Sequence, residues 1–263
     1  MILLSIITIN YNNKQGLADT FESVFSQNHL DFEYIVIDGG STDGSKALIE
    51  NFSDKISYYV SESDDGIYDA MNKGINAASG EYLIFMNSGD CFNDTGTLER
   101  CLQYLSAFPS ADILYADIYM ISNRSAEPVL YTHPATLNIE YFKNYVLNQQ
   151  ASLFKSSLFK ELGLFPFQYK LAGDYWLYLK SFLADKLFIY MDFIMVRYDF
   201  TGLSFTNGGA YRQEQFSIWK DLVPEPLRRT IDQHETPPKS GVFKIIRRFR
   251  TMLKSLFYFK KNI

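Results

Sequence analysis

An apolar run that ends in a small polar turn and an acid, E-Y-L-I-F-M-N-S-G-D at residues 81–90, constrains the fold more than any other part of the chain. Such a run is typical of a parallel strand that is covered on both faces. Residues 4–13 and 32–45 repeat the pattern of a strand followed by a polar turn. Because the carboxyl ends of parallel strands meet at one edge of a sheet, the three turns can converge on one crevice, where open α/β sheets bind nucleotides.

The segments between these strands have helical spacing. Leu17, Phe21 and Val24 recur at the helical period, and apolar residues repeat in the same way at 47–52 and 67–78. A strongly aromatic helix is expected to begin at Asp174. The expected strands are 4–10, 34–38, 56–60, 81–86, 113–121, 129–133 and 187–198. This order predicts an α/β fold with a mostly parallel central sheet and flanking helices.

The body of the chain is acidic and its last segment is basic. Residues 239–263 hold eight Lys or Arg and no acid, a charge of +8, whereas the rest holds 17 basic and 30 acidic residues, a charge of −13. A nucleic-acid binder would have its basic surface on the folded body, so we expect no nucleic-acid partner. The two cysteines, Cys91 and Cys101, indicate no disulfide framework and favour a reducing compartment. The first residues predict a strand and not a signal peptide, and no run reaches the roughly 18 apolar residues of a membrane-spanning helix.

The basic segment 239–263 also has apolar residues at helical spacing, with most of its cations between them. An amphipathic basic helix of this kind suits an anionic membrane surface, which predicts a cytoplasmic protein held peripherally at the inner face of the membrane. The alternative is a helix that docks on the body or on the partner of a homodimer. Prolines 224, 226, 237 and 238 predict a linker at 223–238 before this tail.

Five segments resemble, in order and spacing, the motifs of glycosyltransferase family 2, the inverting enzymes with the GT-A fold. The segments are S-I-I-T-I-N-Y-N-N, I-V-I-D-G-G-S-T-D-G-S, S-E-S-D-D-G-I-Y-D-A-M-N-K-G, G-E-Y-L-I-F-M-N-S-G-D and A-G-D-Y-W-L-Y-L, and together they cover about residues 4–204. The resemblance implies a Rossmann-like GT-A fold with a nucleotide-sugar-binding subdomain at 1–92 and an acceptor-binding subdomain at 93–222. It also implies transfer from a nucleotide-sugar, with UDP as the expected nucleotide, to a saccharide acceptor. A lipid-linked acceptor in bacterial surface polysaccharide synthesis fits the basic tail.

The resemblance places the nucleotide-sugar at the first three strand ends. Tyr11 is placed to stack on the base, and Asp38 to accept from its imide N–H. The further residues implied for this subsite are Ile9, Asn10, Asp64, Asp65, Asn72, Lys73, Asn87, Ser88 and Gly89. Ile9 stands where the family usually has proline, and Gly39 and Gly89 stand where it has acids. The alternatives are that the asparagines only shape a turn, that Asp43 caps a helix and that Lys73 is a surface residue.

Asp90 is the expected metal ligand, because it is the only carboxylate of N-S-G-D, which occupies the family's D-x-D position. Mg²⁺ or Mn²⁺ bound to a diphosphate keeps waters and takes phosphate oxygens, so one protein carboxylate can suffice. The ion would stabilise the departing nucleoside diphosphate. The alternative is a strand-ending turn with an Asp cap.

Asp174 is the expected catalytic base. Inversion requires a group that takes the proton from the acceptor hydroxyl as it attacks, and the family has its base at the acid of this D-Y-x-L pattern. Plain N-capping of the helix is the alternative. Gln149, Gln150, Tyr175 and Trp176 are expected to contact the acceptor, although most aromatic residues in such a helix belong to a core.

A G-L-S segment at 202–204 resembles a loop that closes over the donor. The three histidines, His29, His133 and His234, are scattered and receive no metal role. Two other functions stay open. A sugar nucleotidyltransferase would require a basic triphosphate loop near the N-terminus, where residues 10–16 contain only Lys14. A catalytically inactive nucleotide-sugar-binding protein would account for the acids missing at 39, 87 and 89.

Overall fold

The computed structural model describes residues 2–29, 31–121, 127–199 and 208–233. The chain divides into a large unit, Met1–Val223, and a second unit, Pro224–Ile263. The described part of the second unit contains the helix α10 (Glu225–Gln233). The expected loop at 202–204 and the basic tail at 239–263 lie outside the described residues.

The described part of the large unit is built on one nine-stranded sheet with the order β3-β2-β1-β4-β8-β6-β9-β5, and β7 pairs with β6. Its strands are β1 (Leu4–Asn10), β2 (Glu33–Asp38), β3 (Tyr58–Ser61), β4 (Tyr82–Phe85), β5 (Cys91–Phe92), β6 (Ile113–Ile121), β7 (Val129–Tyr131), β8 (Ser152–Lys155) and β9 (Phe188–Asp199). Strands β1 to β4 are parallel to one another, β8 runs antiparallel to both β4 and β6, and β9 is parallel to β6. The polar turns after β1, β2 and β4 therefore come to one edge of the sheet.

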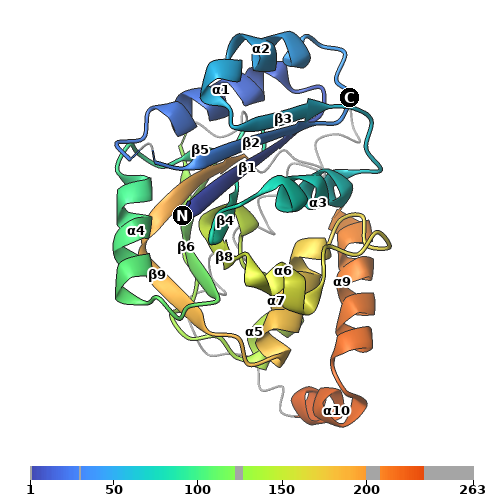
Figure 1. The fold of residues 1–263 in the computed structure, drawn as a ribbon. Coiled ribbons are helices and arrows are strands. Elements are labelled where there is room, and N and C mark those ends of the chain that lie inside the picture. Colours follow the sequence, from blue (N-terminus) through green and yellow to red (C-terminus); the bar gives the residue numbers. More distant parts are fainter. Residues whose placement is uncertain (1, 30, 122–126, 200–207, 234–263) are drawn as a thin grey trace. The chain divides into compact units, whose positions relative to one another are not determined.

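Helices cover both faces of the parallel strands. The helices in the described residues of the large unit are α1 (Lys14–Phe25), α2 (Ser45–Asn51), α3 (Ile67–Ala77), α4 (Thr97–Ala107), α5 (Ile139–Asn144), α6 (Ser157–Leu162), α7 (Gly173–Leu183) and α9 (Gly208–Leu222), with 3₁₀ turns η1 (Ser53–Lys55) and η2 (Gln149–Ala151). Figure 1 shows α1 and α2 on one face of β1–β3 and α3 on the opposite face. The expected α/β fold with a mostly parallel sheet is confirmed.

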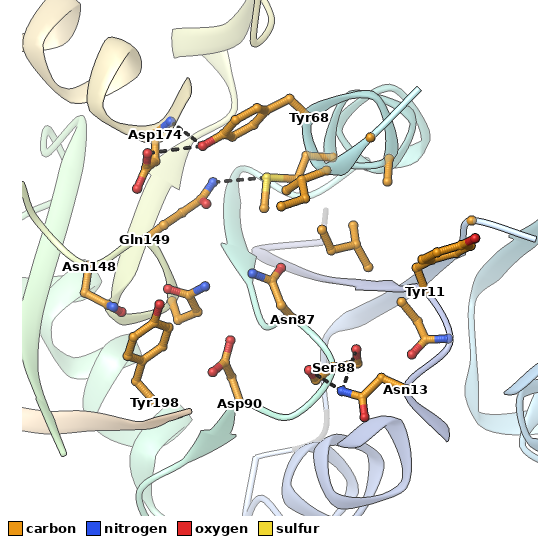
Figure 2. A pocket seen from close by; sticks show the side chains of 18 of the residues that line it. Tyr11, Asn13, Tyr68, Asn87, Ser88, Asp90, Asn148, Gln149, Asp174 and Tyr198 are labelled. Carbon is orange, nitrogen blue, oxygen red and sulfur yellow. Dashed lines mark hydrogen bonds between the residues drawn. The ribbon is translucent and has the colours of Figure 1, made fainter. Parts of the chain in front are cut away.

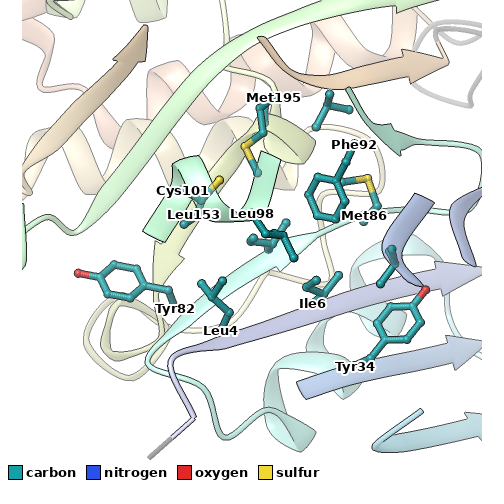
Figure 3. Packing of buried hydrophobic residues seen from close by; sticks show 14 of the residues in the cluster. Leu4, Ile6, Tyr34, Tyr82, Met86, Phe92, Leu98, Cys101, Leu153 and Met195 are labelled. Carbon is teal, nitrogen blue, oxygen red and sulfur yellow. The ribbon is translucent and has the colours of Figure 1, made fainter. Parts of the chain in front are cut away.

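The alternation of side chains along the strands explains the two layers. Leu4 and Ile6 of β1 lie in a buried cluster with Tyr34 of β2, and Figure 3 shows these side chains packed together. Ile7, the residue after Ile6, points to the opposite face and contacts α3. A Cβ atom built on Gly74 of α3 would lie 2.4 Å from Ile7 Cγ2. The missing side chain at Gly74 therefore lets α3 pack directly on β1.

Two expected elements need correction. The third strand lies at Tyr58–Ser61 and not at 56–60, because it pairs with Ile35–Asp38 of β2 in that register. The expected linker 223–238 contains the helix α10. Pro226 falls in the first turn of α10, where a helix has no need of the proline N–H, so the prolines there do not prevent a helix. Among the described residues, no helix is long and apolar enough to cross a membrane.

Candidate functional site

The strand ends open into a cavity of about 1360 Å³. Drug-sized ligands occupy pockets of about 300–1,000 Å³, so this cavity has room for a donor and an acceptor together. Figure 2 shows its walls, with Tyr11, Asn13, Ser88 and Asp90 on the side of the strand ends and Asn148, Gln149 and Asp174 on the other. Of the residues expected to bind, those that line it are Ile9, Asn10, Tyr11, Asp64, Asn87, Ser88, Asp90, Gln149, Gln150 and Asp174.

Asp38 at the end of β2 does not line this cavity. Its carboxylate is fully buried and accepts hydrogen bonds from Ser41 Oγ at 2.5 Å, Ser61 Oγ at 2.6 Å and Asn10 Nδ2 at 2.7 Å. Burial raises the pKa of Asp38, but these bonds outweigh it and hold the pKa below its ordinary value. The expectation that Asp38 binds the base is therefore corrected, since Asp38 anchors the loop after β2 instead.

Asp64 takes a position beside that loop and does line the cavity. A Cβ atom on Gly39 would lie 2.4 Å from Asp64 Oδ2 and 3.3 Å from Tyr11 Cδ2. The glycine at 39 thus leaves space for the Asp64 carboxylate next to the Tyr11 ring, which is 67% exposed. Burial raises the pKa of Asp64, and the hydrogen bond from the Gly66 N–H at 3.0 Å opposes it. An aromatic face and a hydrogen-bond acceptor are therefore side by side here, and these are the two groups that would bind a planar nucleobase.

The turn after β4 holds Asn87 and Asp90 at the cavity wall. The Asp90 N–H donates to the Asn87 carbonyl at 2.9 Å, and Gly89 between them has φ +103°, a conformation that glycine favours. The Asn13 side chain donates to the Ser88 carbonyl at 3.0 Å and ties this turn to the end of β1. Gly89 itself does not line the cavity, so its expected donor contact is not supported by its position.

Asn87 and Asp90 fit a divalent cation. Both side chains project into the same cavity in Figure 2, and Asp90 is only 4% exposed. Asn87 Oδ1 is buried and has no hydrogen-bond partner among the described residues. Amide and carboxylate oxygens are ligands that Mg²⁺ and Mn²⁺ prefer. The described residues contain no group of three or more His, Cys, Asp or Glu that could hold a metal ion, so such an ion would also need oxygens from its substrate.

Asp174 lies in the first turn of α7, across the cavity from Asp90 (Figure 2). Its Oδ1 accepts hydrogen bonds from the Tyr175 N–H at 2.8 Å and from the Tyr68 hydroxyl at 3.1 Å. Burial raises the pKa of Asp174 from 3.8 to about 6; the two hydrogen bonds oppose this rise, and nearby Glu214 adds to it. A carboxyl with a pKa near neutrality can both accept and release a proton.

Tyr68 reaches Asp174 because the facing helix position has no side chain. A Cβ atom on Gly173 would lie 2.8 Å from Tyr68 Cζ, so only glycine lets the ring lie against the start of α7. The Tyr68 hydroxyl is also 3.0 Å from the Leu171 carbonyl, and it accepts from the Asp174 N–H at 3.2 Å. The Asp174 carboxyl is therefore fixed in place from α3 as well as from its own helix.

Tyr175 and Trp176, expected at the acceptor, face away from the cavity. Tyr175 is fully buried and its hydroxyl donates to the Phe142 carbonyl at 2.8 Å. Trp176 packs under the ammonium group of Lys180, which is 4.5 Å from the centre of the ring. This expectation is corrected, because both rings belong to the packing around α7. Gln149 and Gln150 do line the cavity.

Three residues expected at the nucleotide-sugar are occupied elsewhere. Asn72 is buried and exchanges two hydrogen bonds with the backbone of Phe165, at 2.9 and 3.0 Å. Lys73 forms an ion pair with Glu62 at 2.9 Å. Asp65 lies outside the cavity, where its carbonyl accepts from Lys170 Nζ at 3.2 Å. These placements correct the expected contacts of Asn72, Lys73 and Asp65, because the sequence did not show which face of the turn and of α3 each residue occupies.

Part of the cavity wall comes from residues that the motifs did not indicate. They are Ile118, Met120, Tyr131, His133, Val146, Leu147, Tyr198 and Tyr211. Most belong to β6, β7 and the segments that follow them. An alternation of polar and apolar residues there predicts a strand, but it does not predict that one face of the strand lines a cavity. Alternate residues of 118–120 and 131–133 share a face, and this is the signal in the sequence that could have grouped them.

Comparison with known proteins agrees with the fold. The model of Glycosyl transferase family 2 matches residues 5–173. An uncharacterized glycosyltransferase of Mycobacterium tuberculosis is 31% identical over 90% of this chain and 86% of its own length. A PGL/p-HBAD biosynthesis glycosyltransferase of Mycobacterium bovis is 28% identical over 78% of this chain and 80% of its own length.

Solved structures show the same fold at low identity. Residues 1–349 of S. aureus TarS in complex with UDP-GlcNAc superpose with a TM-score of 0.69 at 18% identity, over 87% of this chain and 70% of that one. The mannosyltransferase PcManGT from Pyrobaculum calidifontis, in complex with GDP-Man and Mn²⁺, gives 0.65 at 15% identity, over 87% and 68%. With a family model that covers more than half of its residues and a relative above 30% identity along most of its length, this chain belongs to glycosyltransferase family 2 and is a glycosyltransferase with the GT-A fold.

Proposed function

We propose that the protein is an inverting, metal-dependent glycosyltransferase that moves a sugar from a UDP-sugar to a saccharide acceptor. The observation that carries this proposal is Asp174, a carboxyl with a pKa of about 6 in the same cavity as the strand-end turns of β1 and β4. An inverting reaction needs a catalytic base on the side of the cavity opposite the leaving nucleotide. Asp174 has a pKa near neutrality and lies across the cavity from the proposed nucleotide subsite.

The donor nucleotide is proposed to bind at the ends of β1 and β2. Tyr11 offers its exposed ring for stacking, and Asp64 beside it offers the acceptor for a base N–H, in place of the buried Asp38. Asn13 and Ser88, which line the cavity beside these residues, would lie next to the diphosphate. The UDP-GlcNAc complex of the structurally similar TarS supports a UDP-sugar as donor.

The charge of the cavity supports a divalent cation. Three carboxylates, Asp64, Asp90 and Asp174, line it, whereas no Lys or Arg lines it within the described part of the chain. A diphosphate in such a cavity would face only repulsion from the ionised side chains. Bound Mn²⁺ or Mg²⁺ would supply the positive charge that stabilises the leaving diphosphate. Asp90 and Asn87 are proposed to hold it, and the Mn²⁺ complex of PcManGT is in keeping with this.

Asp174 is proposed to take the proton from the acceptor hydroxyl. The Tyr68 hydroxyl and the Tyr175 N–H both donate to Oδ1, so the carboxylate keeps one orientation. Its other oxygen, Oδ2, faces the cavity (Figure 2). Gln149 and Gln150 line the space beside it and are proposed to orient the acceptor. Plain helix capping would not require a carboxyl at this position to open into the cavity.

The absence of a cation from the described cavity wall also weighs against a sugar nucleotidyltransferase, which must bind a triphosphate. Lys14, the basic residue after β1, is not among the lining residues. Its backbone N–H donates to the Asp43 carboxylate at 2.7 Å. The inactive binding protein is the remaining rival. Turnover, and not binding, distinguishes it.

For the cellular setting we propose assembly of a bacterial surface glycan on a lipid-linked acceptor, with the protein on the inner face of the membrane. The +8 segment at 239–263 supports attraction to anionic lipid. The M. bovis relative named for PGL/p-HBAD biosynthesis supports a role in a biosynthetic pathway. A homodimer that uses the same segment is the competing proposal.

The test is a screen of nucleotide-sugars for slow hydrolysis with Mn²⁺, followed by transfer to saccharide acceptors. We expect one UDP-sugar to be hydrolysed faster than its GDP counterpart. The anomeric configuration of the transferred sugar, read by NMR, should be opposite to that of the donor. A retained configuration would refute inversion, and a protein that binds UDP-sugars but never turns them over would be the inactive rival.

A further inference from the structure

One wall of the cavity is apolar and is built by β6 and the segment through β7. Ile118 pairs with Tyr131 in the β6–β7 ladder, and Met120 lies two residues further along β6. His133 lies two residues beyond Tyr131, so it shares a face with that ring. All four residues line the cavity, together with Val146. These five residues form the β6–β7 wall, and the polar groups of their side chains are the His133 ring nitrogens and the Tyr131 hydroxyl.

The hydrogen bonds around His133 favour one position of the proton on its ring. The Tyr141 hydroxyl donates its single proton to the Val146 carbonyl at 3.1 Å. His133 Nδ1 lies 3.1 Å from that same hydroxyl oxygen. The two contacts are both hydrogen bonds only when the hydroxyl accepts from Nδ1, and this arrangement leaves Nε2 of the neutral imidazole with a lone pair.

That lone pair has no partner. His133 is 5% exposed, and its Nε2 makes no hydrogen bond to any described residue. Burial lowers the pKa of His133 to about 4, so the ring is neutral at physiological pH. A buried acceptor without a donor is destabilising, and a buried polar group that lacks a protein partner needs an explanation, such as a ligand that supplies the donor.

We propose that the β6–β7 wall is the acceptor subsite, and that it selects a ring with an apolar face and a hydroxyl that donates to His133 Nε2. This rests on the proposed function, because it names the class of acceptor for the same cavity. The apolar face of the ring packs on Ile118, Met120 and Tyr131. Its hydroxyl supplies the donor that the protein lacks. An aromatic alcohol and a sugar ring both have this chemistry.

The test is NMR of the histidine ring nitrogens in the full-length protein, titrated with phenol and, separately, with methyl β-D-glucopyranoside. The chain has three histidines, and His133→Phe assigns the signals by their loss. We expect the free protein to show His133 protonated on Nδ1 only. We expect the Nε2 signal to move on addition of one or both ligands, while toluene, which has the apolar face but no hydroxyl, leaves it in place. Which ligand moves it more distinguishes the aromatic from the saccharide source.

His133→Phe keeps the ring and removes the acceptor. It should weaken binding of the hydroxyl-bearing ligand by about fivefold to tenfold, the worth of one hydrogen bond, and leave toluene binding unchanged. Tyr141→Phe is the second variant, because it frees Nδ1 and should make His133 sample both proton positions. His29→Phe, at a half-buried histidine that does not line the cavity, is the matched control.

A His133 ring protonated on Nε2, or an Nε2 signal that neither ligand moves, would overturn the subsite. Equal affinities of parent and His133→Phe for the hydroxyl-bearing ligand would do the same. None of these measurements uses a donor, so their failure leaves the glycosyltransferase proposal intact. Failure of the donor screen would in turn leave the binding result standing.

Discussion

Replacing Asp174 with Asn should abolish transfer and, at neutral pH, stabilise the protein. The native fold holds this carboxyl where ionisation is disfavoured, with a pKa raised from 3.8 to about 6. A proton is therefore bound more tightly in the folded than in the unfolded chain. Below pH 3.8 the group is neutral in both states and carries no penalty. Between pH 3.8 and 6 the unfolded chain releases this proton while the folded chain keeps it, so stability is lost across this window. Above pH 6 the group is ionised in both states and the loss stays at its full size.

The size of the gain follows from the shift. A change of about two pKa units corresponds to about 3 kcal/mol at pH 8, because each unit is worth 1.36 kcal/mol. Asn keeps an oxygen that can accept from the Tyr175 N–H and the Tyr68 hydroxyl, so most of this gain should be realised. For a unit of this size each 1 kcal/mol raises Tm by about 2–4 °C. Transfer should fall by orders of magnitude, while UDP affinity stays unchanged because the base acts in the transition state.

The assay is thermal unfolding of both proteins at pH 8 and at pH 4, beside the transfer rate. Asp38→Asn is the control with the opposite sign, because hydrogen bonds lower the pKa of Asp38 and its ionised form stabilises the fold. That variant should lose stability at pH 8, and the loss should shrink as pH falls through the folded pKa. If Asp174→Asn is no more stable than the parent at pH 8, or transfers within about tenfold of it, a difference of only about 1.4 kcal/mol, then Asp174 is a helix cap and not the base.

Three further outcomes are expected. Asp90→Asn should abolish the Mn²⁺ dependence of UDP binding in calorimetry, whereas Asp65→Asn, outside the cavity, should keep it; equal behaviour of the two would contradict the metal assignment. Tyr68→Phe removes a hydrogen bond that lowers the pKa of Asp174, so the acid limb of the transfer rate should move to higher pH by up to about one unit, and an unmoved limb would refute the contact. Deleting 239–263 should release the protein from anionic vesicles, since each cation near such a surface contributes about 1 kcal/mol, and equal co-sedimentation of both forms would refute the membrane proposal.

The parallel half of the fold was predictable because its signals are local. The mostly apolar segments Leu4–Asn10 and Tyr82–Phe85 are short and end in polar turns, which is typical of strands covered on both faces, and helical spacing marks the segments between them. The helix α10 within the expected linker at 223–238 was not predicted, because a proline in the first turn of a helix and a proline in a loop look the same in the sequence. The short strand Cys91–Phe92 has no local signal at all; it exists because it pairs with β9, about 100 residues later in the chain.

The site was predictable at strand ends and less so on helices. A strand end delivers its next residues to a known edge, which is why Tyr11, Asn87 and Asp90 all line the cavity. A helix can turn any residue toward or away from a site, and Tyr175 turns into the core. His133 could not be recognised from the sequence, because its meaning depends on the bond from Tyr141 to a carbonyl five residues further along.

The acids missing from the turns after β2 and β4 do not by themselves imply an inactive protein. Gly89 has φ +103°, where a side chain would be strained, and its N–H donates to the Gly16 carbonyl at 3.0 Å. An acid at Gly39 would have its Cβ 2.4 Å from Asp64 Oδ2, so this corner has space for one carboxylate, and Asp64 already supplies it. The cavity thus keeps three carboxylates: Asp64 beside the proposed nucleobase site, Asp90 at the proposed cation site and Asp174 at the proposed acceptor site. Since these are the positions at which we propose that an inverting transfer uses a carboxylate, we infer that the glycines reflect a rearranged set of acids and not a lost activity.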